Sequence, residues 1–195
     1  MRRLILTLMA IVTSALLRVP ASAGEVEVPC DFLTGGGFII RNSGAKANFG
    51  VGGGCKDGSP TWGHLQYIDH GNGLNVHWTA ITAYLFEHQH DPDPQTGQPR
   101  GARLIRGTAR TNLFGDVDFF VIADDNGEPG GDDLFVIRLG KDGVCQYTTE
   151  GDLDHTLGGS DPGGGNIQLH KPNASTTGAF EGSCPARAAV GCPAS

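Results

Sequence analysis

DVDFFVIADDNGEPGGDDLFVIRL, residues 116–139, contains two short apolar segments, Val117–Ala123 and Leu134–Leu139, on either side of a polar segment. Both apolar segments are rich in valine, isoleucine and phenylalanine and are bounded by turn-forming residues, a pattern typical of paired β-strands. The connection Asp124–Asp133 is too long for a two-residue hairpin, so we expect an ordered acidic loop there.

The rest of the chain has the same character. It contains 31 glycines and 11 prolines, which helices tolerate poorly and which turns between short strands require. Leu74–Thr79 alternates, which would place Leu74, Val76 and Trp78 inward and Asn75, His77 and Thr79 outward. No segment after the N-terminus has helical periodicity, so we expect an almost all-β protein.

Short candidate strands recur along the chain with turn residues between them. They are Phe38–Arg41, Lys46–Val51, His64–Asp69, Leu74–Thr79, Ile81–Phe86, Leu104–Ala109, Val117–Ala123, Leu134–Leu139, Gln146–Thr149 and Asn166–His170. Eight to ten such strands predict an antiparallel, jelly-roll-like β-sandwich of two sheets, with a closed antiparallel β-barrel as the alternative. We interpret Gly35–Gly37 as a sharp turn or a close backbone approach, and Gly52–Gly54 as the end of a strand.

The first 23 residues resemble a secretory signal peptide. Arg2 and Arg3 form a positive region, Leu4–Leu17 an apolar region, and Ala21–Ala23 an A-x-A cleavage site. No later apolar stretch is long enough to span a membrane as a helix. We therefore expect a secreted or periplasmic single domain, residues 24–195, that does not insert into a membrane after the signal is removed.

The chain is acidic. It has 21 acidic and 14 basic residues and a formal net charge of −7. Removal of the signal peptide would take away Arg2, Arg3 and Arg18 and no acidic residue. Such a chain repels phosphate backbones, so nucleic acid is not expected as a partner. The expected partner is an extracellular or envelope protein or a glycan.

All five cysteines follow the predicted cleavage site, at positions 30, 55, 145, 184 and 192. Export to an oxidising compartment favours disulfides, and an odd number leaves at least one cysteine over. Several pairings are possible. Our first interpretation pairs Cys30 with Cys184 and Cys55 with Cys145, and leaves Cys192 in a tail that is poorly ordered after about residue 184.

Several long segments resemble a known domain family. They are CDFLTGGGFI (30–39), AKANFGVGGGCK (45–56), GHLQYIDHGNGLNVHWTAITAY (63–84), RGTARTN (106–112), GDVDFFVIADDNGEPGGDDLFVIRL (115–139) and GGGNIQLHKPN (163–173). Together they are similar to the post-COAP-type domain of bacterial exported proteins, over roughly Cys30 to Cys184. The resemblance implies an exported bacterial β-domain of unassigned function, and supplies no catalytic residues.

The acidic loop is a candidate calcium site. Calcium binds six to eight oxygen ligands, and a loop interrupted by glycines can direct carboxylates to one point. The candidate ligands are Asp124, Asp125, Asn126, Glu128, Asp132 and Asp133, with Asp116 and Asp118 upstream. The EF-hand spacing is not met. The alternative interpretation, which we favour, is a solvated loop whose Asp and Asn side chains cap their own backbone.

Histidines form a second candidate cluster. His64, His70 and His77 lie close together in the sequence, and His88 and His90 follow. On a strand, His88 and His90 would share one face, which is suited to binding a metal ion. However, Pro92 stands where the H-x-H-x-D-H hydrolase motif has Asp, and Glu87–Arg100 is predicted to be an exposed, proline-rich loop. Surface histidines without a metal are therefore the favoured interpretation.

Motifs for catalysis are missing from the sequence. There is no G-x-S-x-G and no H-E-x-x-H. Asp69 with His70 or His77 could form an acid–base pair, although Asp69 is better interpreted as a turn cap.

Four aromatic residues, Trp62, Tyr67, Trp78 and Tyr84, could stack on a sugar or peptide, but large rings more often pack in the core.

The sequence as a whole predicts a secreted, non-enzymatic β-domain that acts as a binding or structural module, with calcium ordering of the acidic loop as a further hypothesis. The alternative is a secreted, glycan-directed hydrolase that uses paired carboxylates, since a glycosidase needs only two suitably spaced carboxyl groups.

Overall fold

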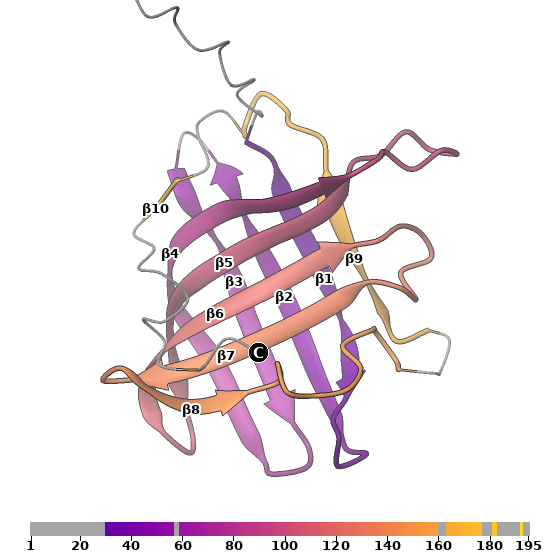
Figure 1. Ribbon diagram of the computed structural model, residues 1–195. Coiled ribbons are helices and arrows are strands. Elements are labelled where there is room, and N and C mark those ends of the chain that lie inside the picture. Colours follow the sequence, from indigo (N-terminus) through magenta and orange to yellow (C-terminus); the bar gives the residue numbers. More distant parts are fainter. Residues whose placement is uncertain (1–29, 57–58, 160–162, 177–180, 183–191, 193–195) are drawn as a thin grey trace, which may run out of the picture.

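The computed structural model describes residues 30–56, 59–159, 163–176, 181–182 and 192, and all regular elements among them are β-strands (Figure 1). The predicted signal peptide lies outside the described residues. The strands are β1 (Phe32–Ile40), β2 (Lys46–Lys56), β3 (Ser59–Asp69), β4 (Leu74–His90), β5 (Arg100–Thr111), β6 (Gly115–Asp125), β7 (Leu134–Lys141), β8 (Val144–Thr148), β9 (Gly165–His170) and β10 (Glu181–Gly182).

These strands form one antiparallel sheet in the order β8-β7-β6-β5-β4-β3-β2-β1-β9, with β10 paired to β4. The prediction of an antiparallel all-β fold is therefore confirmed. The two separate sheets of the predicted sandwich are not found, because each strand from β1 to β8 pairs with the next along the chain. The sheet curls into an open half-barrel, so the closed-barrel alternative is also wrong (Figure 1).

β4 makes the curl possible. It is 17 residues long, and its first four residues pair with β3 while most of its length pairs with β5. The β4–β5 ladder shifts register at three places, between Trp78 and Ala80, between Ile81 and Ala83, and between Phe86 and His88. Such bulges bend and twist a strand, so Ile81–Phe86 continues the strand that begins at Leu74, and this one strand serves both halves of the sheet.

The core lies between the two facing halves of the curled sheet. The predicted pair of apolar strands is confirmed as β6 and β7, with Val121 opposite Ile137. Phe135 of β7 stacks on Phe49 of β2 with ring centroids 3.9 Å apart. Aromatic and aliphatic side chains from strands far apart in the sequence thus supply the apolar burial that stabilises the fold.

Two glycine segments lie within strands, and the turn and strand end predicted there are not found. Gly35–Gly37 pairs with both β2 and β9, and Gly52–Gly54 pairs with both β1 and β3. The alternative, close backbone approach, is what the structure shows: a Cβ on Gly37 would lie 2.2 Å from the carbonyl oxygen of Gly164. No other residue type would let this edge of the sheet pack so closely.

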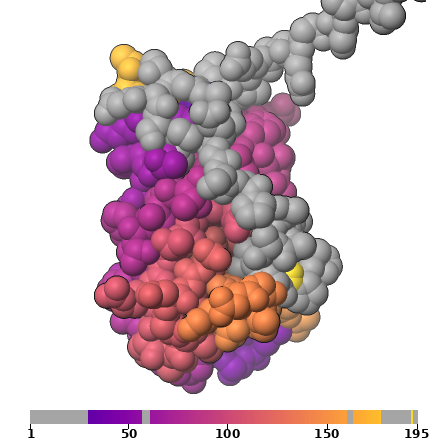
Figure 2. Space-filling view, turned by 90° about the vertical axis from the view of Figure 1, so that its left-hand side faces the viewer, coloured from indigo at the N-terminus to yellow at the C-terminus, as the bar shows by residue number. Residues whose placement is uncertain are grey.

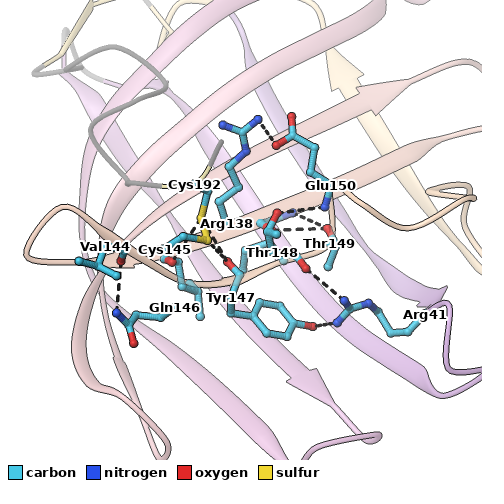
Figure 3. The surroundings of a disulfide bond; sticks show 12 residues. Arg41, Arg138, Val144, Cys145, Gln146, Tyr147, Thr148, Thr149, Glu150 and Cys192 are labelled. Atoms are coloured by element: carbon cyan, nitrogen blue, oxygen red, sulfur yellow. Dashed lines mark hydrogen bonds and ion pairs between the residues drawn. A yellow bond between two sulfur atoms is a disulfide. The ribbon is translucent and has the colours of Figure 1, made fainter. Parts of the chain in front are cut away.

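The disulfides differ from the predicted pairing. Cys30 is bonded to Cys55, and Cys145 to Cys192. The first joins the neighbouring ends of β1 and β2. The second fixes Cys192, which was expected in a poorly ordered tail, against the edge strand β8, with its Sγ 3.7 Å from the carbonyl oxygens of Leu139 and Tyr147 (Figure 3). Cys184 lies outside the described residues.

Two disulfides suit an oxidising compartment outside the cytoplasm. Among the described residues there is no helix with the length and apolarity that crossing a membrane would require.

Candidate functional site

Two residues of the acidic loop, Asp125 and Asp133, hold the edge strand β9. Asp133 Oδ2 accepts the backbone N–H of Ile167 at 2.7 Å, and Asp125 Oδ2 accepts that of Leu169 at 2.7 Å. Ile167 and Leu169 are alternate residues of β9, and their N–H groups point away from β1. An exposed edge strand invites pairing with other chains, and here two carboxylates occupy the donors that a further strand would use.

The remaining oxygens of the two carboxylates order the loop itself. Asp133 Oδ1 accepts the N–H of Asn126 at 2.9 Å, and Asp125 Oδ1 accepts that of Gly127 at 2.9 Å. Burial raises the pKa of Asp133 to about 6 and also raises the pKa of Asp125, against the opposing effect of these hydrogen bonds. Both residues therefore have a structural role that needs no metal ion.

The other loop residues are directed elsewhere. Glu128 Oε1 accepts the Asn166 side-chain amide at 3.1 Å, and the Asn126 amide donates to the carbonyl oxygen of Asp132 at 3.0 Å. In the described part of the chain, one group of three or more His, Cys, Asp or Glu side chains brings its ligand atoms within 4.8 Å of one another, and of the loop residues it contains only Asp124. Calcium binding by the six candidates stays a prediction.

That group consists of Asp124 with His88 and His90. The proline-rich segment is a loop only from residue 91 to 99, because β4 continues to His90. His88 and His90 are therefore strand residues with their rings 4.7 Å apart. The sequence analysis assigned the two histidines and Asp124 to different candidate sites, and only the strand order β4-β5-β6 brings them together.

Asp69 is part of a different network. Its Oδ1 accepts the N–H of Gly71 at 2.7 Å, as a turn cap does. Its Oδ2 accepts hydrogen bonds at 2.7 Å from Arg41 and from the hydroxyl of Tyr147, and Arg41 also pairs with Asp152. This network ties β3 to the edge strand β8, and Figure 3 shows its contact between Arg41 and Tyr147. Asp69 therefore has a role in holding the half-barrel together.

The four candidate aromatic residues separate into core and surface. Tyr67 and Tyr84 are fully buried. Trp62 is half-buried and makes an edge contact with Phe32, with centroids 6.3 Å apart. Trp78 is 44% exposed, although the alternating pattern predicted it inward. Trp78 is paired with Ala109, the ladder shifts register directly after it, and residues 77–80 are all exposed.

Trp78 lies in a shallow groove of about 430 Å³. The lining residues are Asn75, His77, Trp78, Thr79, Arg110, Thr111 and Asn112. Thr79 and Arg110 also line an adjoining charged cavity of about 570 Å³ with Asp116, Asp118, Lys141 and Asp142. Both lie where β4, β5, β6 and the β7–β8 turn adjoin, the side that faces the viewer in Figure 2.

The groove is rigid because its polar side chains also hold the turns together. Asn112 Oδ1 accepts the N–H of Asn75, and its Nδ2 donates to the carbonyl oxygen of Gly73, both at 2.8 Å. Asn75 Oδ1 accepts the Gln66 amide at 3.0 Å. The Arg110 guanidinium, by contrast, is largely exposed, with its Nε 3.5 Å from Asp116 Oδ1.

Sequence reasoning did not identify Arg110 or Asn112 as groove residues. The segment RGTARTN alternates, and this would have placed Thr108, Arg110 and Asn112 on one face of a strand. Their position beside Trp78 follows from the β4–β5 register, in which His77 is opposite Arg110, and a register between strands cannot be read from either strand alone.

No protein-family model matches this chain, and no curated protein and no solved structure matches it. The similarity to the post-COAP-type domain therefore remains an expectation from the sequence. The function has to be argued from the groove and the side chains around it.

Proposed function

We propose that this protein is an exported, non-enzymatic binding module that recognises a neutral, hydroxyl-rich ligand, such as an extracellular glycan, in the groove around Trp78. The observation that carries the proposal is a large indole that is 44% exposed among amide, hydroxyl and guanidinium groups. An indole offers an apolar face for stacking, and the groups around it can hydrogen-bond to hydroxyls.

The setting of the carboxylates supports binding rather than hydrolysis. Asp125 and Asp133, the two carboxyls whose pKa burial raises, already accept backbone N–H groups with both oxygens. Asp116, beside the groove, is a largely exposed partner of Arg110. A glycosidase needs one shielded carboxylic acid as proton donor, and none of these three acids offers one in the groove.

The chain contains only two tryptophans, which makes the proposal directly testable. In a Trp62→Phe variant, Trp78 is the only source of indole fluorescence. We expect soluble polysaccharides or envelope glycans that bind in the groove to shift and quench this emission. Loss of a central tryptophan contact typically costs 2 kcal/mol or more, so in calorimetric titrations, which need no indole reporter, Trp78→Ala should weaken binding of the same glycan about 30-fold.

The control is Trp62→Phe itself, which should bind like the unmodified protein. Binding that survives Trp78→Ala, or that is lost on Trp62→Phe, would place the ligand elsewhere. Release of shortened glycan products during the same incubation would instead establish the hydrolase.

A further inference from the structure

We propose that His88, His90 and Asp124 form a binding site for a zinc-class divalent cation on the outer face of the sheet, remote from the Trp78 groove and independent of the function proposed for it. The site lies at the ends of β4 and β6, on either side of β5, towards the right of Figure 1.

The strand register places the three side chains on one face. His88 is opposite Ala102, and Ala102 is opposite Asp124, and residues directly opposite each other in an antiparallel pair share a face. His90 is two residues beyond His88 and therefore lies on the same face. The methyl group of Ala102, which is fully buried, is small enough for the imidazoles and the carboxylate to approach one another above β5.

The distances match a tetrahedral ion. His88 Nε2 lies 3.2 Å from Asp124 Oδ2, His90 Nε2 lies 3.3 Å from Asp124 Oδ1, and the two Nε2 atoms lie 3.2 Å apart. Two ligands bound tetrahedrally to zinc at about 2.0–2.1 Å are separated by about 3.3–3.4 Å. The three donor groups are thus spaced like three corners of a zinc coordination sphere.

The carboxylate provides a second, independent observation. Asp124 is only 5% exposed, and its Oδ1 makes no hydrogen bond. No lysine or arginine of the described chain is within ion-pair distance of it; the basic groups near it there are the two imidazoles. A buried carboxylate normally has a cationic or hydrogen-bonding partner, and a metal ion between Asp124 and the histidines would be that partner.

The donor set indicates which ion. Two imidazole nitrogens and one carboxylate oxygen suit zinc and similar transition metals, whereas calcium prefers sites built from oxygen alone. The side chain of His88 is 46% exposed, so an ion can enter from solvent and keep a water molecule, or a group of a partner, in its fourth position. Such an ion would cross-link β4 to β6.

The test is titration of the protein with zinc chloride in a calorimeter, using protein that carries no histidine tag and has both disulfides formed. We expect one zinc ion per chain. Asp124→Asn keeps the shape of the side chain and removes its charge, and it should weaken binding at least about 100-fold, more than changes around the ligands usually cost. His90→Gln should have the same effect.

The matched control is His70→Gln. His70 is an exposed histidine on the turn between β3 and β4, where it hydrogen-bonds to Asn48 of β2. The His70→Gln variant should bind zinc normally. Cobalt(II) provides a second measurement, since tetrahedral coordination gives intense visible absorption that Asp124→Asn should abolish.

Three results would overturn the proposal: no zinc binding by the unmodified protein, binding that His90→Gln and Asp124→Asn leave unchanged, or binding that His70→Gln removes. Glycan binding reported by Trp78 fluorescence should be the same with and without zinc, so failure of one proposal leaves the other standing.

Discussion

Asp124 and Asp125 are consecutive in the chain and almost equally buried, yet their surroundings are opposite. Asp125 faces the interior and accepts two backbone N–H groups, from Gly127 and Leu169. Asp124 faces the outer side of the sheet and contacts two imidazoles, with Oδ1 making no hydrogen bond. Consecutive strand residues point to opposite faces, so a single acidic segment carries a structural carboxylate and a candidate metal ligand side by side.

The comparison teaches that burial alone does not define a role for a carboxylate. Asp125 and Asp133 are satisfied by the fold, and removal of either would leave buried donors without acceptors. Oδ1 of Asp124 accepts no hydrogen bond from the described chain. The predictions below test whether the two faces differ in this way.

The largest expected effect is on stability, at Asp133. Asp133→Ala removes the acceptor of the N–H groups of Ile167 and Asn126, and each buried donor left without a partner costs about 1–3 kcal/mol. The free energy of unfolding, measured by urea denaturation, should fall by about 2–6 kcal/mol. Asp132→Ala is the control, because Asp132 is exposed and only its backbone carbonyl accepts a hydrogen bond from Asn126. Equal losses in both variants would contradict the assignment.

The next largest effect is the stabilisation of the folded protein by zinc, which should depend on Asp124. The stability without zinc should depend on Asp125. A ligand that binds only the folded state at 100 times its dissociation constant stabilises a protein by about 2.7 kcal/mol. Zinc should stabilise the unmodified protein to this extent and Asp124→Asn not at all. Without zinc, Asp124→Asn should change stability by less than about 1 kcal/mol, whereas Asp125→Ala should cost about 2 kcal/mol. If Asp124→Asn is the more destabilising of the two variants without zinc, the assignment of the structural role to Asp125 is wrong.

The buried carboxyl group of Asp133 should make the free energy of unfolding depend on pH. The pKa of Asp133 is raised by burial from its ordinary value of 3.8 to about 6, so the folded state binds this proton more tightly than the unfolded state does. The contribution of Asp133 to stability is therefore greatest below pH 4 and falls as the pH rises through 6. Urea midpoints of the unmodified protein, taken relative to Asp133→Asn, should decrease over that range. A constant difference would show that Asp133 does not titrate there.

How much of this could be predicted from the sequence depends on the distance over which each contact acts. The strands β6 and β7, their pairing and the acidic loop follow from one continuous stretch, because apolar runs and turn residues are local signals. The sequence placed His88 and His90 in the predicted loop Glu87–Arg100, which was wrong for them because β4 continues to His90; once they lie on a strand, their shared face follows from alternation. Asp124 could not be added to them, because β5 lies between.

The failures have a common physical cause. For Gly35–Gly37 the sequence left a sharp turn and a close backbone approach open, because glycine permits both, and only the strand pairing decides for the second. Trp78 was expected inward from the alternation of its own strand, which does not show how far the neighbouring strands cover that residue. Disulfide pairing depends on the positions of strand ends in space, so Cys192 could not be assigned to Cys145 from spacing.

The smallest expected effect is that of calcium, which tests the acidic loop itself. A calcium ion there would have to share the oxygens of Asp125 and Asp133 with four backbone N–H groups, and Asp124 points to the other face. We therefore expect millimolar calcium to raise the free energy of unfolding by less than about 0.5 kcal/mol, since weak binding gives little linkage. Thermal unfolding with calcium and with a chelator measures this. A rise of several degrees that Asp132→Ala removes would instead establish the loop as a calcium site, with its backbone hydrogen bonds ordering the ligands in advance.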